Sequence, residues 1–231
     1  MIEVIDLDYT YPDGKKALKN INLRIEDGEK IALLGPNGAG KSTLLLQLNE
    51  ILAGEGTVKV DGITLRKANL PEIRARLGMV FQNSEDQLFS PTVYEDVAFG
   101  PIYQGLGKQE IHERVKDALL QVGLRGYEER NPYHLSNGEK KRAAIATVLS
   151  MNPCVLVFDE PSAGLDPRAR RELISLLQGL PQTMIIATHD LDLANQLTGK
   201  TIIMDNGRIV MAGGTQEILT NEELLWEHGL K

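Results

Sequence analysis

The sequence predicts an α/β fold in which a block of helices interrupts an alternation of strands and helices. Strand-like and helix-like segments alternate at both ends of the 231-residue chain, but between about Glu85 and Met151 no strong strand pattern occurs. Two of the strand-like segments are short runs that are almost wholly apolar, which is typical of strands buried on both faces of a sheet. With 42% hydrophobic residues, the chain can bury the core of one large domain, or of a domain with a subdomain.

The first part of the chain predicts strands around one helix. Residues 3–11 and 20–26 alternate apolar and polar side chains, as half-exposed strands do, whereas the run at 30–35 is apolar and ends in glycine. The helix is expected over 42–52, closed by Gly54. The predicted strands of this part are 3–11, 20–26, 30–35, 56–62 and 77–82.

The rest of the chain predicts three helices and then a return to alternation. The acidic segment 215–230 is expected to be helical as well. Predicted helices of the central block are 92–105, 108–123 and 138–151, and a further helix is expected over 166–180. The predicted strands that follow the block are 154–160, 183–189, 201–205 and 208–213.

Composition limits the classes of function. The chain has 25 basic and 32 acidic residues, a net charge of −7, which argues against nucleic acid as a partner. Cys154 is the only cysteine, so no intramolecular disulfide is possible, and its place before an apolar run predicts a small buried core residue. The first residues carry acids where a signal peptide has its apolar stretch, and no apolar window is long enough for a membrane span. We therefore expect neither a signal peptide nor a membrane-spanning segment.

The strongest motif is GPNGAGKST, which follows an apolar strand and opens a helix. It satisfies the phosphate-binding pattern G-x-x-x-x-G-K-[ST], in which glycines let backbone amides curl around a phosphate. Lys41 would place its charge on the β- and γ-phosphates, and the Ser42 hydroxyl would bind Mg²⁺. The predicted nucleotide contacts are Gly35, Pro36, Asn37, Gly38, Ala39, Gly40, Lys41, Ser42 and Thr43.

Polar side chains follow three other predicted strands. Asp159 and Glu160 end the apolar run VLVF, at the end of a strand where α/β proteins bind their ligands. Asp159 would belong to the Mg²⁺ shell, and Glu160 would deprotonate the attacking water. His189 ends the next buried strand and could reach the same phosphates. Gln82 ends the strand at 77–82 and could place an amide near the metal and the water.

A second anion site is indicated by LSNGEKKR, residues 135–142. Ser136 followed by Glu139 fits a capping box, and the free amides of a helix N-terminus bind anions well. The chain already has a phosphate-binding loop far upstream, so a second site needs a different phosphate.

Taken together, these motifs resemble the ATP-binding subunit of an ABC transporter along essentially the whole chain. The resemblance places Gly35–Thr43 at the Walker A loop, Gln82 in the Q-loop, and LSNGE at the signature. VLVFDE matches Walker B, SAGLD the D-loop, and His189 the H-loop. It implies a P-loop NTPase fold of the ABC ATPase type, a mixed sheet with an antiparallel β edge, and one ATP-binding domain. The implied division is an α/β core, residues 1–84 and 152–231, with a helical subdomain, residues 85–151.

The resemblance also assigns roles. An aromatic residue near the N-terminus stacks on adenine in this family, and Tyr11 matches it, with Tyr9 on the same strand face as the alternative. Implied catalytic residues are Lys41, Gln82, Glu160 and His189, and implied Mg²⁺ ligands are Ser42, Gln82 and Asp159. Members of the family form head-to-tail dimers around two ATP molecules, so Ser136 and Gly138 would grip the partner's γ-phosphate. Asn137 and Glu139 depart from the usual LSGGQ, which bears on the rate of hydrolysis.

The segment Gln82–Pro101 resembles the ATPases of energy-coupling-factor importers, which take up cobalt, nickel or vitamins. It implies membrane subunits as partners, a second identical or paralogous ATPase subunit, and a peripheral location on the cytoplasmic face of the membrane. The four histidines are scattered, so the substrate would be selected by the membrane subunits. The alternatives are the ATPase of an exporter, a P-loop kinase, which would need neither LSNGE nor SAGLD, and a DNA-repair or translation ATPase. The last would need a long heptad insertion or tandem cassettes.

Overall fold

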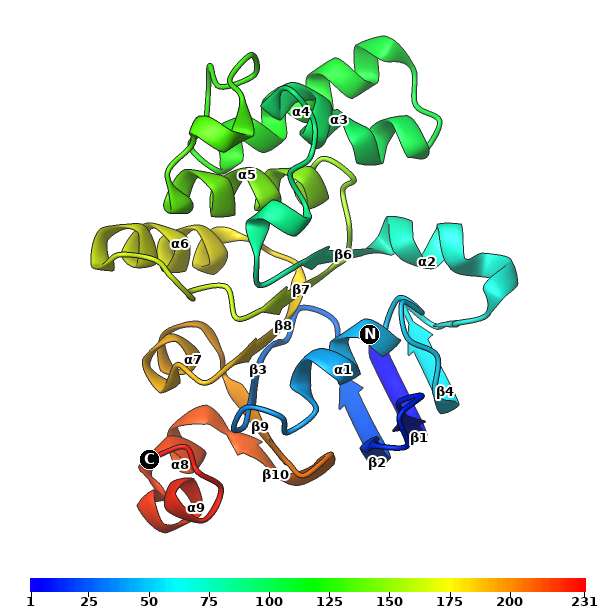
Figure 1. Ribbon diagram of the computed structural model, residues 1–231, viewed down its shortest axis with the longest axis vertical. Coiled ribbons are helices and arrows are strands. Elements are labelled where there is room, and N and C mark those ends of the chain that lie inside the picture. Colours follow the sequence, from blue (N-terminus) through cyan, green and yellow to red (C-terminus); the bar gives the residue numbers. More distant parts are fainter.

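The predicted mixed α/β architecture is confirmed by a computed structural model that describes residues 1–231 (Figure 1). A six-stranded sheet has the order β10-β9-β3-β8-β7-β6, parallel except for β10, and a separate antiparallel sheet has the order β2-β1-β4-β5. The strands are β1 (Ile2–Thr10), β2 (Lys16–Ile25), β3 (Lys30–Leu34), β4 (Glu55–Val60), β5 (Ile63–Thr64), β6 (Leu77–Val80), β7 (Val155–Asp159), β8 (Thr183–Thr188), β9 (Lys200–Asp205) and β10 (Arg208–Gly214).

The six-stranded sheet is covered on both faces, which is why its central strands are continuously apolar. Along β7, Val155 and Val157 belong to the buried cluster that includes the antiparallel sheet, whereas Leu156 and Phe158 belong to the cluster that includes the helices of the central block. The helices are α1 (Lys41–Gln47), α2 (Leu70–Arg76), α3 (Val93–Tyr103), α4 (Lys108–Gln121), α5 (Asn137–Leu149), α6 (Pro167–Gly179), α7 (Leu191–Leu197), α8 (Thr215–Thr220) and α9 (Glu222–Glu227).

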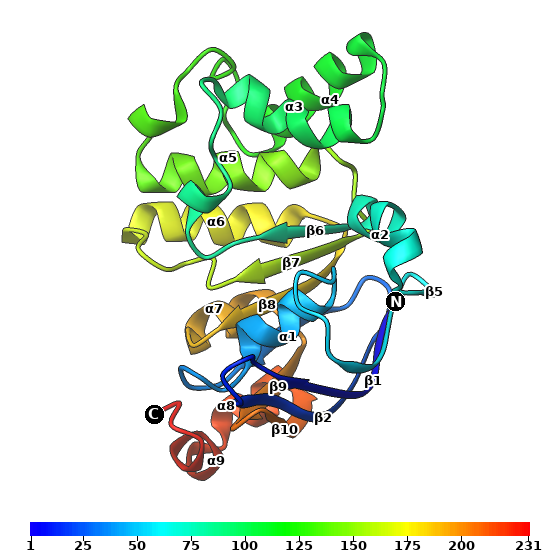
Figure 2. The ribbon, with the colours of Figure 1, turned by 45° about the vertical axis from the view of Figure 1, so that its right-hand side comes forward.

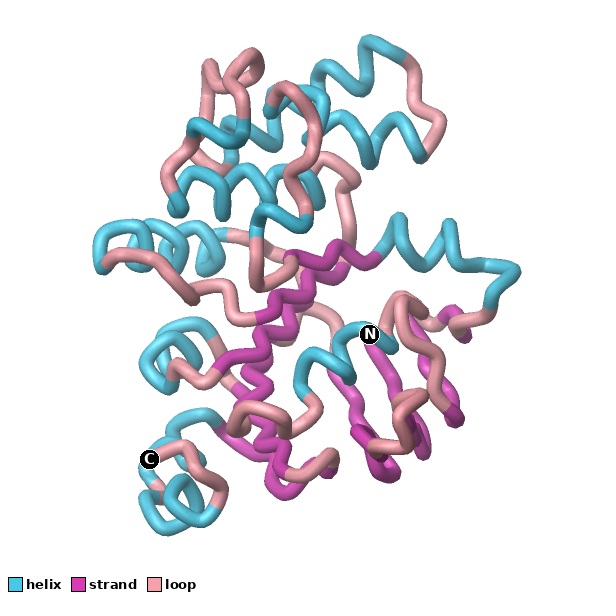
Figure 3. The backbone as a smooth tube through the Cα atoms, viewed as in Figure 1, coloured by secondary structure: helices cyan, strands magenta, loops and turns pink.

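Helices α3, α4 and α5 lie together at one end of the molecule, in green in Figure 1, and carry no strand among them, as Figure 3 shows. Helix α5 runs beside α6 above strands β6 and β7 (Figure 2). One buried apolar cluster includes side chains from these helices and from the sheet, so the block shares its core with the sheet. The division into residues 85–151 and the remaining α/β core stays a proposal.

Several local expectations were wrong. Helix α1 ends at Gln47, and a turn with Glu50 at φ 54° follows. Gly54 does not close this helix; a Cβ there would lie 2.3 Å from the carbonyl oxygen of Asp8, so glycine permits the close approach to β1. Cys154 is exposed rather than buried, because it lies in the connection that precedes β7.

Other differences concern short elements. Helices α2 and α7 were not expected; each is only seven residues long. The acidic C-terminal segment is helical, as expected, and is divided into two helices, because Asn221 interrupts it and caps α9 by accepting a hydrogen bond from the amide of Leu224. None of the helices is both long enough and apolar enough to cross a membrane.

The shared core makes a prediction about stability. Phe158 is 0% exposed and belongs to the cluster common to the sheet and the helical block. We expect Phe158→Ala to lower the free energy of unfolding by about 3–5 kcal/mol, because its ring contacts are lost and a cavity remains. Urea unfolding followed by circular dichroism measures this. Tyr133, 65% exposed, is the control, and Tyr133→Ala should change the free energy by less than about 0.5 kcal/mol. Equal losses in the two variants would contradict the shared core.

Candidate functional site

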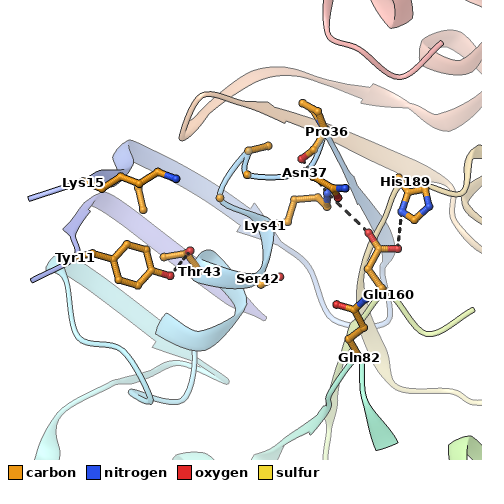
Figure 4. A pocket seen from close by; sticks show the side chains of 14 residues that line it. Tyr11, Lys15, Pro36, Asn37, Lys41, Ser42, Thr43, Gln82, Glu160 and His189 are labelled. Carbon is orange, nitrogen blue, oxygen red and sulfur yellow. Dashed lines mark hydrogen bonds and ion pairs between the residues drawn. The ribbon is translucent and has the colours of Figure 1, made fainter. Parts of the chain in front are cut away.

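The predicted phosphate-binding loop forms one wall of a cavity of ≈ 360 Å³. Tyr11 and Lys15 lie at one side of this cavity and Glu160 and His189 at the other, with the loop between them (Figure 4). Most predicted site residues are therefore brought together. The cavity is lined by Tyr11, Lys15, Ala17, Pro36, Asn37, Gly38, Ala39, Gly40, Lys41, Ser42, Thr43, Gln82, Glu160 and His189.

The loop leaves β3 at Leu34 and enters α1 at Lys41, the strand–loop–helix context that the motif requires. Gly40, the residue before α1, is left-handed at φ 103°, and a Cβ there would lie 2.8 Å from the carbonyl oxygen of Ala17. At Gly35 a Cβ would lie 2.2 Å from the Met204 carbonyl oxygen. Any side chain at these two positions would force the loop away from the strands that support it.

Lys41 is buried and points back over its own loop. Its Nζ donates to the carbonyl oxygens of Gly35 at 2.6 Å and Pro36 at 3.2 Å, and lies 3.8 Å from Oε1 of Glu160. Burial lowers the pKa of Lys41, while the negative charges of Glu160 and Asp159 oppose that shift. The loop thus presents the ammonium group of Lys41. Only the carboxylates at the end of β7 offset its charge.

Glu160 is the most constrained residue of the site. It has φ 44°, which is uncommon for a non-glycine residue, and its amide donates to the Ala187 carbonyl at 2.8 Å. The carboxylate accepts a bond from the Thr188 hydroxyl at 3.2 Å and lies 3.0 Å from Nδ1 of His189. Its side chain is 9% exposed, against 64% for His189. The backbone and the side chains of Thr188, His189 and Lys41 therefore hold one carboxylate at the edge of the cavity.

Of the predicted Mg²⁺ ligands, Ser42 and Gln82 line the cavity, whereas Asp159 lies beside Ser42 but is not among the lining residues. Burial raises the pKa of Asp159, and the nearby Ser42 hydroxyl opposes this shift. One carboxylate oxygen of Asp159, Oδ1, is buried without a hydrogen-bond partner. A buried acceptor without a partner next to a hydroxyl suits a hard cation such as Mg²⁺, which prefers oxygen ligands. Gln82 follows β6 and directs its amide into the same cavity (Figure 4).

Tyr11 lines the cavity, and Tyr9 does not. The Tyr11 hydroxyl lies 2.9 Å from Oγ1 of Thr43, while the Tyr9 ring packs against the core and meets Tyr11 edge-on at 5.0 Å. Lys15 and Ala17 also line the cavity, and sequence reasoning missed both. The Tyr11 amide donates to the Lys15 carbonyl across the turn at 2.9 Å. This pairing of the two residues could have indicated that Lys15 lies beside Tyr11 at the site.

Ser136 and Gly138 line a different cavity, of ≈ 520 Å³, between the start of α5 and the start of α6. The capping box at Ser136 is confirmed: its hydroxyl accepts from the Glu139 amide, and its own amide donates to Oε2 of Glu139 at 2.8 Å. Gly138 is needed here because a Cβ would lie 2.8 Å from Cβ of Ala169. Because Ser136 and Gly138 line this second cavity, the structure does not bring them to the phosphate-binding loop of the same chain.

Glu139, one of the two departures from LSGGQ, has its charge fully engaged. Its carboxylate accepts bonds from the Tyr127 hydroxyl at 2.7 Å and from the Ser136 hydroxyl at 2.7 Å, as well as from the Ser136 amide. The Tyr127 bond is the largest cause that lowers the pKa of Glu139 to about 2, followed by the bonds from Ser136. Sequence reasoning did not find Tyr127, because no local pattern connects it with Glu139.

The lowered pKa of Glu139 predicts a pH dependence of stability. The stabilisation from its charged form is present above the ordinary pKa of 4.5 and is lost as pH falls toward about 2. We therefore expect Glu139→Gln to be less stable than the wild type at pH 7, and the difference to shrink on going to pH 3. Urea unfolding at the two pH values measures it. Glu129→Gln is the control, and a pH-independent difference for Glu139→Gln would contradict the assigned bonds.

The chain matches known proteins along its length. The family model described as ABC transporter matches residues 18–163. A protein of Geobacter sulfurreducens, provisionally named as an ABC transporter ATP-binding protein, is 51% identical over 97% of this chain and 91% of the relative. An energy-coupling factor transporter ATP-binding protein, EcfA, of Methanocaldococcus jannaschii is 47% identical over 100% of this chain and 85% of the relative.

Solved structures agree. CbiO1 from Clostridium perfringens, described as part of the ABC transporter complex cbiONQ, superposes with a TM-score of 0.86 at 40% identity and covers 100% of this chain and 94% of that chain. A dimeric ATP-binding cassette, MJ0796, in a post-hydrolysis state with ADP and Pi, gives a TM-score of 0.83 at 29% identity over 93% of this chain and 99% of that chain. With this match and the motifs in place around one cavity, the chain belongs to the ABC transporter family and is an ATPase of that family.

Proposed function

We propose that the chain is the ATP-hydrolysing subunit that powers a membrane importer. The observation that carries this proposal is the separation of two phosphate sites in one chain. The P-loop with Lys41 and Glu160 lines one cavity, whereas Ser136 lines another. A subunit built in this way needs a second subunit to complete each nucleotide site, which links ATP binding to the association of two subunits.

The nucleotide binds along the P-loop with its base toward Tyr11. The Tyr11 ring offers a flat face for adenine, and Lys15, on the facing side of the hairpin, is placed to contact the sugar or the α-phosphate. Lys41 exchanges its two carbonyl partners for the β- and γ-phosphates, since a phosphate oxygen is the better acceptor for a buried ammonium. The remaining contacts are the loop amides from Gly35 to Thr43.

The Ser42 hydroxyl, the Gln82 amide and Asp159 would hold Mg²⁺. The partnerless Oδ1 of Asp159 and the hydroxyl beside it supply the observation that fits a cation here. When bound, the ion neutralises charge on the phosphate oxygens. With such an ion bound, Asp159 would stay in its charged form, against the effect of burial.

Hydrolysis is general-base catalysis by Glu160. Its carboxylate takes a proton from water while the water oxygen attacks the γ-phosphorus, and the bond to the ADP oxygen breaks. His189, with Nδ1 at 3.0 Å from the carboxylate, orients Glu160 and lies at the mouth of the cavity where the γ-phosphate would be. The strained backbone of Glu160 keeps the carboxylate at the end of β7 before substrate binds.

The partner surface follows from the second cavity. Ser136, the amides of Asn137 and Gly138, and the left-handed turn at Gly164 line it, and this set binds the γ-phosphate held by the partner's P-loop. The two sites are related by a two-fold axis in a head-to-tail dimer. The partner is a second copy of this chain or a paralogue.

Membrane subunits bind on the helical block. Phe89 and Phe99 meet edge-on at 5.4 Å, yet both are more than half exposed, and Ile102 and Tyr103 are exposed nearby on α3. An exposed apolar group of this size marks a protein interface. Because the group lies between Gln82 and α4 in the chain, membrane subunits bound there would sense movements of the Q-loop and place the ATPase at the cytoplasmic face of the membrane.

The importer is of the energy-coupling-factor type and takes up cobalt or nickel ions or a vitamin. The segment Gln82–Pro101 and the likeness to EcfA and to cbiO1 of the cbiONQ complex support this subtype. An exporter is the alternative, because the ATPase motifs are the same in both. Purification of the chain with its membrane partners and identification of those partners distinguishes the two. An exporter's membrane subunits in the purified complex would overturn the importer assignment.

The role of Glu160 predicts a specific loss. We expect Glu160→Gln to bind ATP but to hydrolyse it about 10²–10⁴ times more slowly, because the base is absent from the transition state. The variant should also accumulate an ATP-dependent dimer in size-exclusion chromatography. Glu129→Gln, far from the cavity in sequence and absent from its lining, is the matched control. Near-normal turnover in Glu160→Gln would remove this residue from the role of base.

Sharing of the two sites predicts rescue between inactive subunits. Lys41→Ala and Ser136→Arg should each be inactive alone, but a mixed dimer has one site with both defects and one site with none. Since random mixing makes half the dimers mixed, roughly a quarter of wild-type activity should return where one intact site suffices. ATPase activity of mixed and unmixed samples measures this.

The rescue experiment needs two controls. The first is proof that subunits exchange, and the second is a covalently linked dimer with one intact site. With exchange and one-site activity both established, failure of every mixing ratio would show that Ser136 does not serve the partner's ATP, and would leave it as an ordinary helix cap.

A further inference from the structure

Lys141 is a buried lysine outside the nucleotide cavity. It lies on α5, five positions after Ser136 in the sequence, and is only 3% exposed. Its Nζ donates to the carbonyl oxygen of Gln82 at 2.7 Å and reaches that of Phe81 at 3.4 Å. The side chain therefore runs from the helix of the signature to the backbone of the Q-loop.

A charged group at this depth is costly, and an apolar side chain would fill the same space more cheaply. Burial lowers the pKa of Lys141 to about 8, and the charge of Asp159 opposes the shift. The nearby Asp159 and the two carbonyl dipoles are the only compensation that the surroundings offer. The contact between Lys141 and the Gln82 carbonyl therefore indicates a role other than packing of the core.

Two neighbouring contacts attach the same segment to the same helix. Lys140 forms an ion pair with Glu85 at 2.6 Å. Gln87 donates through Nε2 to the Ala144 carbonyl at 2.9 Å and to the Thr147 hydroxyl at 2.7 Å. Residues 82–87 are therefore attached to α5 at several points. Of these contacts, only the one from Lys141 is made to Gln82, whose side chain lines the nucleotide cavity.

We propose that Lys141 is a positioning residue, which fixes the position of Gln82 relative to the signature segment at the start of α5. Binding of the partner's ATP at the signature would thereby be coupled to the placement of Gln82 in the chain's own nucleotide site. The proposal rests on the shared-site dimer described above. A helix is stiff over this distance, about 7.5 Å from Ser136 to Lys141, so a displacement at the signature is carried to the amine. The amine holds the Gln82 carbonyl, and the Gln82 side chain follows its backbone.

The test is Lys141→Met, which has nearly the same shape but donates no hydrogen bond. We expect kcat for ATP to fall about 10–100-fold, since small misplacements of positioning groups have costs of this size, while KM for ATP stays within about twofold. The matched control is Lys116→Met, an exposed lysine on α4, which should leave both constants unchanged. Wild-type kcat in Lys141→Met would overturn the proposal.

A double-mutant cycle with Gln82→Ala separates positioning from a general loss of structure. If Lys141 acts through Gln82, the double variant should be no slower than Gln82→Ala alone. Additive losses would show that Lys141 acts elsewhere, and would overturn the proposal. Where Lys141→Met unfolds, as judged by circular dichroism, Lys141→Leu, which also lacks a hydrogen-bond donor, enters the same cycle with the same expectation.

The failure of this proposal is distinguishable from failure of the proposed function. Absence of an ATP-dependent dimer in Glu160→Gln, together with near-normal turnover, would contradict the function itself. Wild-type kcat in Gln82→Ala would overturn the coupling, because turnover would then not depend on the position of Gln82. A normal dimer and a slow Gln82→Ala, together with an unaffected Lys141→Met, would contradict only the coupling through Lys141.

Discussion

The site depends on the parallel pairing of β3, β8, β7 and β6, because that pairing aligns the ends of the strands. Leu34 lies opposite Thr188, and Asp159 lies opposite Ala187. The residues that leave these strands, the P-loop, Glu160 and His189, therefore emerge at one edge although they are far apart in the sequence. Glu160 extends the pairing by one more bond, to the Ala187 carbonyl, before the chain turns. Loss of that register would separate the lysine from its carboxylates even if every motif were kept.

The same register underlies the proposed need for a second chain. Helix α5 lies across the strands on the side of β6 and β7 and carries Ser136 at its N-terminus, in a cavity of its own. The P-loop opens toward Glu160 and His189, and no residue of the signature lines that cavity. A second subunit can supply what is missing while presenting its own P-loop to the first. The proposed dimer closure thus follows from the separation between the sheet edge, which carries the P-loop, and the N-terminus of α5, which carries Ser136.

The fold and most of the site could be predicted because their signals are local. The P-loop glycines, the apolar strands before Asp159 and His189, and the capping box at Ser136 each lie within a few residues of one another. What could not be predicted depends on pairs far apart in the sequence. Tyr127 contacts Glu139 and Lys141 contacts Gln82 only because the chain folds back, and no spacing rule connects them. The early end of α1 and the exposure of Cys154 likewise depend on tertiary packing, which overrides local preference.

The two departures from LSGGQ have different physical meanings in this setting. Asn137 is the first residue of α5 and adopts no strained backbone, so the helix does not require glycine there. Glu139 does more, because its carboxylate holds the Ser136 hydroxyl at 2.7 Å, the same hydroxyl that is proposed to donate to the partner's phosphate. Phosphate binding must therefore replace one charge-assisted hydrogen bond by another, which makes the exchange nearly neutral in energy.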